Sequence, residues 1–250
     1  MRVPLLTEVT PGLYRYADGL VNWYVLEDAG RVVLLDTGWP RSWPRVQAAL
    51  GELGRVPGDL TAILLTHGHA DHLGAAEDAR RASKAPVYAS RDELARVTGN
   101  KAGGSSFAIL PRLAPHLWKP KALEFATRAS FQGFMTPKWV DDPKGWEPGT
   151  TLELPGRPLL VATPGHTEGH ASILLTELRV LIAGDALCTR DPLTGAAGPR
   201  LLADPLNEDT DMARRSLDAL ERLEAEIVLP GHGDPWRHGV ADAVVAAKSS

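Results

Sequence analysis

Short apolar runs that contain β-branched residues recur along the chain, separated by polar, glycine-rich or proline-rich stretches. Runs of this kind predict β-strands. The predicted strands are Trp23–Leu26, Val32–Leu35, Ala62–Leu65, Leu159–Ala162, Ile173–Thr176, Val180–Ala183 and Ile227–Leu229.

Other segments have apolar residues at helical spacing, and they lie between several of the predicted strands. In one of them, Leu217 and Leu220 belong to an apolar stripe on a single face. Because helices and strands alternate, the sequence predicts an α/β domain. The predicted helices are Trp43–Leu53, Leu73–Ala82 and Asp209–Leu223.

The segment 100–148 interrupts this alternation. It holds all 4 phenylalanines of the chain, and its 5 lysines and 2 arginines against 4 acidic residues give it a net charge of +3. We interpret it as a helical, aromatic-rich lid or subdomain inserted into a single domain, 1–250, where it would close over a substrate. An insertion that only packs on the surface is the alternative. The predicted lid residues are Trp118, Phe131, Phe134, Trp139 and Trp146.

Composition and charge narrow the functional classes. The 250 residues are 44% hydrophobic with a net charge of −4, which is typical of a soluble domain and lacks the basic balance of nucleic-acid binders. The single cysteine, Cys188, excludes an intramolecular disulfide. No stretch is apolar for long enough to span a membrane, and the N-terminus has no signal-like segment. We therefore expect a cytoplasmic protein, monomeric or homo-oligomeric, with neither a nucleic acid nor a membrane as partner.

The strongest chemical signal is the sequence THGHADH at residues 66–72. It follows a predicted strand, precedes a predicted helix and supplies His67, His69, Asp71 and His72 within six positions. Imidazole and carboxylate together suit zinc, and less selectively iron or manganese. We expect the small Gly68 to let the backbone fold tightly between ligands.

Three later segments place a possible ligand just beyond the end of a predicted strand. They contribute His166 from TPGH, Asp185 from GD and His232 from PGH. Sites in α/β sheets form at the carboxyl ends of strands, so these side chains are expected to converge with the first motif. The sequence therefore predicts a metal site built from five histidines and two aspartates.

This pattern resembles the metallo-β-lactamase superfamily, whose signature His-x-His-x-Asp-His is followed by a later His, Asp and His. The resemblance covers about Asn22 to His232 and implies a four-layer αββα sandwich. It also implies two Zn²⁺ ions, with iron or manganese as alternatives. One ion would bind His67, His69 and His166, the other would bind Asp71, His72 and His232, and Asp185 would bridge them. Asp36 would support the ligand loop, and His170 would pack behind the site.

The implied chemistry is hydrolysis by a metal-bound hydroxide, with Asp71 and Asp185 as the catalytic carboxylates and Asp71 able to pass a proton to the leaving group. The chain differs from particular subfamilies at a few positions, and these differences narrow the range of possible substrates. Superfamily β-lactamases usually have Cys or Ser where this chain has Asp185, and acyl-homoserine lactonases commonly have Tyr where it has Cys188. Only 18 residues follow His232, too few for the C-terminal domain of glyoxalase II.

We therefore predict a hydrolase of a small-molecule ester, thioester or lactone. Three alternatives stay open. The first is a mononuclear iron enzyme resembling persulfide dioxygenases. The second is a lactonase or β-lactamase side activity. The third is a metal-loaded binding protein without catalysis.

Overall fold

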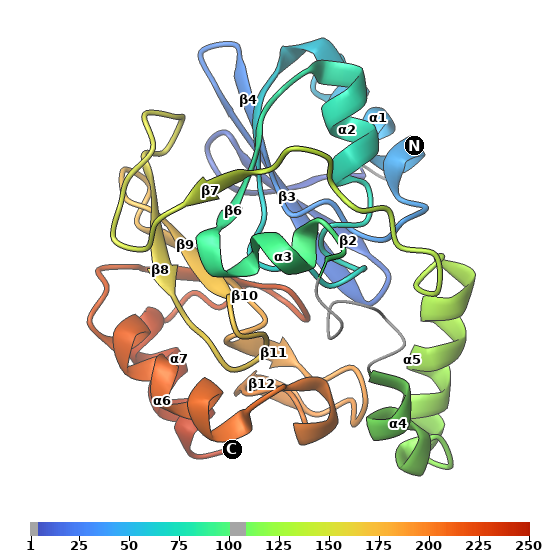
Figure 1. The fold of residues 1–250 in the computed structure, drawn as a ribbon. Helices are drawn as coiled ribbons and strands as arrows, with labels where there is room; N and C mark the ends of the chain where they lie inside the picture. Colours follow the sequence, from blue (N-terminus) through green and yellow to red (C-terminus); the bar gives the residue numbers. More distant parts are fainter. Residues whose placement is uncertain (1–4, 101–108) are drawn as a thin grey trace.

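The computed structural model describes residues 5–100 and 109–250, so part of the predicted insertion, residues 101–108, lies outside the described residues (Figure 1). The first sheet has seven strands in chain order, antiparallel from β1 to β4 and parallel from β4 to β7. Its strands are β1 (Thr7–Thr10), β2 (Leu13–Asp18), β3 (Val21–Asp28), β4 (Arg31–Leu35), β5 (Leu60–Leu64), β6 (Val87–Ser90) and β7 (Lys144–Trp146).

The second sheet has four strands in the order β13-β10-β9-β8, and a small two-stranded sheet is formed separately. The strands of the second sheet are β8 (Pro158–Ala162), β9 (Ala171–Leu175), β10 (Val180–Gly184) and β13 (Ile227–Pro230). The small sheet pairs β11 (Cys188–Arg190) with β12 (Ala197–Arg200). The helices are α1 (Trp43–Glu52), α2 (Ala76–Ser83), α3 (Leu94–Val97), α4 (Leu110–Leu113), α5 (Pro120–Phe131), α6 (Thr210–Glu221) and α7 (Val240–Lys248). Short 3₁₀ turns cover Pro57–Asp59, Arg91–Glu93, Ala114–His116 and Asp204–Leu206.

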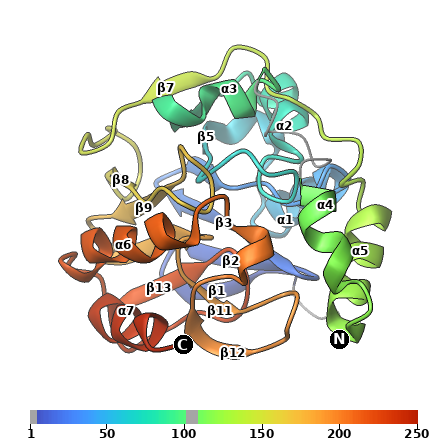
Figure 2. The same cartoon turned by 60° about the horizontal axis from the view of Figure 1, so that its bottom comes forward.

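Side chains alternate along each central strand, so one strand serves two hydrophobic layers. In β4, Val32 and Leu34 pack against α1 and α2, whereas Val33 and Leu35 face the second sheet. The outer face of the second sheet packs against α6 and α7, for example through Leu181. Figure 2 shows these two helix pairs on opposite sides of the strands. The order helix, sheet, sheet, helix confirms the predicted four-layer αββα sandwich.

The end of the segment 100–148 belongs to the core, which corrects two of the predicted lid residues. Trp146 lies in β7, is 2% exposed and packs between the two sheets, where its indole N–H donates to the Thr150 carbonyl at 3.1 Å. Trp139 packs with the cluster between α1, α2 and the first sheet, and its ring lies against Gly99. Trp146 is thus a core side chain and Trp139 packs, partly buried, against the core, because β6 pairs with the three-residue β7 and draws the chain back into the sheet.

The described part of the insertion that precedes Trp139 forms α4, a 3₁₀ turn and α5. The buried face of α5 packs through Phe125 against Trp39 and the start of β11. Phe134 meets Trp39 edge-on, with ring centroids 6.3 Å apart. Trp118 and Phe131 remain exposed. In the described residues no helix combines the length and the apolar character needed to cross a membrane.

Candidate metal centre

All seven predicted ligands come from loops that follow the carboxyl ends of strands. The loop after β5 carries the first motif, and the segments after β8, β10 and β13 carry the others. Their ligand atoms lie in compact groups, within 4.8 Å of one another in each group. We call His67, His69 and His166 the three-histidine group, and Asp71, His72 and His232 the acidic group. Asp185 forms a further group with His67 and His72.

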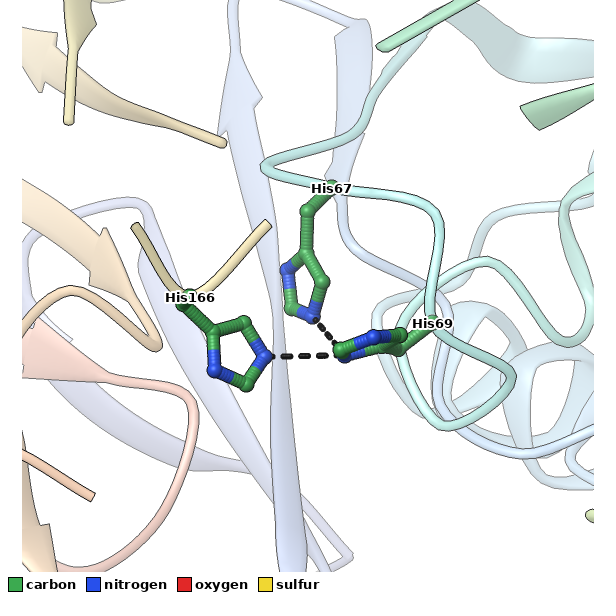
Figure 3. A group of neighbouring side chains, drawn as sticks. All are labelled: His67, His69 and His166. Atoms are coloured by element: carbon green, nitrogen blue, oxygen red, sulfur yellow. Dashed lines mark hydrogen bonds between the residues drawn. The ribbon is translucent and has the colours of Figure 1, made fainter. Parts of the chain in front are cut away.

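The three-histidine group points its nitrogens at one place (Figure 3). His69 Nδ1 lies 3.1 Å from His67 Nε2 and 2.8 Å from His166 Nε2. Burial lowers the pKa of His67 and of His69 well below the usual range, and the neighbouring imidazoles lower it further. Burial also lowers the pKa of His166, although Asp185 opposes the shift. Neutral rings leave free lone pairs, which is the state that ligates a metal.

The acidic group is held by opposite charges. Asp71 Oδ2 lies 3.9 Å from His72 Nε2 and 3.7 Å from His232 Nε2. Burial alone would lower the pKa of both histidines, yet the carboxylates, led by Asp185, raise it. Burial would raise the pKa of Asp185, but His232, His72 and His166 hold it well below the usual range.

Asp185 contacts both groups. Its Oδ2 lies 3.3 Å from His166 Nε2 and 3.2 Å from His232 Nε2, while its Oδ1 lies 3.5 Å from His72 Nε2. The side chain is 3% exposed, so these contacts are made away from bulk water. One carboxylate therefore lies where it reaches both sets of ligands.

Hydrogen bonds on the far ring nitrogens orient four of the histidines, as outer partners do in metal sites. These partners are the Thr66 hydroxyl for His67 (3.0 Å), Asp36 Oδ2 for His72 (2.8 Å), Asn207 Oδ1 for His166 (3.2 Å) and the Leu20 carbonyl for His232. Asp36 also accepts from the Thr66 N–H and hydroxyl, at 2.9 and 2.8 Å. The sequence pointed to Asp36 but not to Asn207 or Leu20, which belong to no motif.

The donor set fits a metal cation. His72 Nε2 is buried and, among the residues that the structure describes, has no hydrogen-bond partner. Leaving such a nitrogen unsatisfied costs about 1–3 kcal/mol unless something else binds it. Around it, imidazole nitrogens and carboxylate oxygens converge, which is the ligand chemistry of zinc, iron and manganese.

Comparison with known proteins agrees with this donor set. The family model described as the metallo-beta-lactamase superfamily matches residues 16–232. The chain belongs to this superfamily.

Among its relatives within the superfamily is the probable metallo-hydrolase YflN of Bacillus subtilis. The two are 29% identical over 245 residues, which is 91% of this chain and 86% of the relative. A metallo-beta-lactamase family protein of Thermus thermophilus has a similar structure, with a TM-score of 0.70 and 28% identity, covering 97% of this chain and 80% of that one. The Rm3 metallo-beta-lactamase shares the fold at 20% identity, with a TM-score of 0.68 over 98% of this chain and 91% of its own.

Two further groups lie behind Asp185. The backbone N–H of Asp185 donates to His170 Nε2 at 3.0 Å, and His170 Nδ1 lies 2.8 Å from the Thr163 hydroxyl. Burial lowers the pKa of His170 to about 3, so the ring is neutral and can accept from Asp185. Cys188 Sγ lies 3.6 Å from Asp185 Oδ1, and burial raises the pKa of this thiol well above the usual range. Both side chains pack against Asp185, and neither joins the groups of converging ligand atoms in the described part of the chain.

Proposed function

We propose that this superfamily member hydrolyses an ester, thioester or lactone bond of a small molecule and that two zinc ions assist the reaction. One ion would be held by the three-histidine group, the other by the acidic group, and Asp185 would contact both. The observation that carries the proposal is the position of the Asp185 carboxylate, within 3.5 Å of His166, His72 and His232. When bound, zinc supplies Lewis acidity and makes water a usable nucleophile at neutral pH.

The side chains of the chain itself would perform three tasks. Asp185 and its neighbouring histidines would keep the charged centre in place, because hydrogen bonds on their far sides leave the rings little freedom. Asp71 is 8% exposed and would carry the proton from the attacking water to the leaving group. The partly exposed His69 marks the side from which a substrate would approach.

One observation favours a thioester as the substrate, and a second favours water as the nucleophile. First, the superfamily relative in Haemophilus influenzae is a hydroxyacylglutathione hydrolase, 28% identical over 130 residues, which are 52% of this chain and 50% of the relative. Its named substrate is a thioester. Second, the thiol of Cys188 is buried and raised in pKa beside Asp185, so it is not available as a nucleophile and water would have to serve.

The test uses protein of measured zinc content against a panel of thioesters, lactones, aryl esters, phosphodiesters and β-lactams. Asp185→Asn should remove the activity, whereas Asp218→Asn, an exposed aspartate on α6, should retain it. We expect about two zinc ions per chain and turnover of at least one ester, thioester or lactone. A fully zinc-loaded protein that turns over nothing in the panel would be a binding protein. One iron per chain with oxygen uptake on a persulfide would instead favour the dioxygenase.

A further inference from the structure

Two charged side chains are buried beside the ligand loops. Glu93 ends the 3₁₀ turn after β6, and Arg96 lies in α3; each is 1% exposed. Neither belongs to a metal-fitting group among the described residues. Burying a carboxylate and a guanidinium is costly unless their hydrogen bonds are satisfied, so their contacts indicate what they hold in place.

Glu93 joins the two loops that carry the three-histidine group. Its Oε1 accepts the N–H of Gly68, between His67 and His69, at 2.9 Å. Its Oε2 accepts the Gly169 N–H at 3.1 Å and the Thr167 hydroxyl at 3.0 Å, in the loop that carries His166. A single carboxylate thus sets the spacing of these loops.

Arg96 extends the same connection. Its Nε lies 3.0 Å from Glu93 Oε1, and its other end pairs with Glu208. Glu208 accepts the Glu168 N–H at 2.9 Å and donates its own N–H to the His166 carbonyl at 3.1 Å. The loop that carries His166 is therefore held at two points by one network of charged side chains.

The glycines of the two loops match this arrangement. A Cβ at Gly68 would lie 2.8 Å from Arg96 Cγ, and a Cβ at Gly169 would lie 2.4 Å from the Glu93 nitrogen. Neither glycine has a positive φ. Gly68 is therefore required by its close contact with Arg96.

We infer that Glu93 is a positioning residue that fixes the separation of the two loops and so presets the three-histidine group for its metal ion. Glu93 forms hydrogen bonds to both loops at backbone and hydroxyl groups outside the ring cluster, so it connects the loops without touching the imidazoles' ligand nitrogens. Within the acidic group, Asp71 itself lies 3.7 Å from His232 and 3.9 Å from His72. This inference rests on the metal site of the proposed function, and it assigns separate supports to the two halves of that site.

The experiment measures stepwise zinc affinities of Glu93→Gln by competition with a chelating dye. Glutamine keeps the shape but presents an amide N–H to groups that are themselves donors. We expect one zinc equivalent to bind about 10- to 100-fold more weakly, the range seen for outer partners of metal ligands. The other equivalent should stay within about threefold of the parent. His69→Ala and His232→Ala serve as references that show which equivalent belongs to which group.

Glu77→Gln is the matched control, because Glu77 is also a buried glutamate paired with arginines but lies on α2, away from the ligand loops. It should leave both zinc affinities unchanged even if it lowers stability. Unchanged zinc binding in Glu93→Gln, or an equal loss at both sites, would overturn the inference.

Amide exchange in the metal-free protein gives a readout that needs no zinc. The Gly68 and Gly169 N–H groups should exchange at least about tenfold faster in Glu93→Gln than in the parent, and no faster in Glu77→Gln. If the parent protein binds no zinc, the proposed function fails, while this comparison still decides whether Glu93 holds the loops. Unaltered exchange of both glycines would refute that role.

Discussion

The three-histidine group and the acidic group share one edge of the fold, yet they are held together differently. The first consists of neutral rings whose pKa values burial lowers, and its two loops are joined by hydrogen bonds to Glu93. The second contains its own carboxylate and histidines whose pKa values the carboxylates raise. Geometry therefore organises one half of the site and charge organises the other. Variants that remove charge from the acidic group and variants that remove the Glu93 hydrogen bonds should therefore affect different halves.

The largest effect should come from Asp185, which contacts both halves. Asp185→Asn keeps the size of the side chain but removes the charge that faces His72, His166 and His232. We expect zinc content to fall from about two ions per chain to one or fewer, and hydrolysis to fall by well over about 100-fold, beyond the range for outer partners. Metal analysis with kcat/KM on the best panel substrate measures both. A variant that retains two ions and full activity would show that Asp185 does not join the two halves of the site.

A buried carboxylate outside both halves provides the reference for stability. Burial alone would raise the pKa of Glu77, but hydrogen bonds from Arg80, the Asp141 N–H and Arg81 lower it to about 2. Because the folded-state pKa lies below the unfolded value, this stabilisation is complete above about pH 4.5 and disappears as the pH falls toward 2.

Glu77→Gln should therefore lower the free energy of unfolding at pH 7 by about 1.5–3 kcal/mol, the range for hydrogen bonds to a charged group, because glutamine removes the charge that Arg80 and Arg81 bind. The difference from the parent should shrink steadily below about pH 4.5. Urea unfolding of both metal-free proteins at about pH 7, 4 and 3 measures it. A constant difference across this range would mean that Glu77 acts through packing and not through its charge.

Asp36 is the counterpart of Glu93 in the acidic half. It accepts from His72 Nδ1 and from two groups of Thr66. Its φ of 52° is a left-handed conformation that asparagine also tolerates, so Asp36→Asn leaves the backbone unstrained. We expect the zinc equivalent of the acidic group to bind about 10- to 100-fold more weakly, with a smaller change in the three-histidine group through Thr66 and His67.

Stepwise zinc titration of Asp36→Asn beside Glu93→Gln compares the two supports directly. The two variants should weaken different equivalents, and the double variant should combine both losses. If both variants weaken the same equivalent, the supports are not separate and the contrast between the halves is lost.

The sequence could predict the features that neighbouring residues along the chain determine. It could not predict the features that depend on contacts between distant segments. The strands at the centre of both sheets were predicted because residues such as Val32–Leu35 are apolar on both faces. Strands β1, β2, β6 and β7 were missed, since TEVT, LYRYAD, VYAS and KGW contain no long apolar run and depend on their neighbours for pairing. The last helix, α7, was also missed because its alanines and valines give it no clear apolar stripe.

The candidate site divides in the same way. The ligands within HGHADH lie in one short motif, so the sequence itself shows that they belong together. Asn207 and Glu93 have no such pattern, since each reaches its ligand loop only through the folded chain. Two glycines were the signal in the sequence that another side chain packs closely against the ligand loops. Gly68 and Gly169 mark close approaches, but a sequence does not say which side chain approaches.

The smallest expected effect concerns the insertion, whose described residues touch neither half of the metal site directly. Phe131 and Trp118 are both exposed aromatics, at 73% and 79%, but only Phe131 lines a cavity of about 180 Å³ beside Leu20, whose carbonyl holds His232. If the segment acts as a lid over a substrate, Phe131→Ala should raise KM by a few-fold at unchanged zinc affinity, because one exposed aromatic contact contributes only a modest part of binding. Trp118→Ala should change neither quantity.

Steady-state kinetics on substrates of increasing acyl length separates the two variants, since the difference in KM should grow with acyl length. Equal KM values for both variants and the parent would assign this face of α5 to surface packing, which is the alternative that the sequence left open.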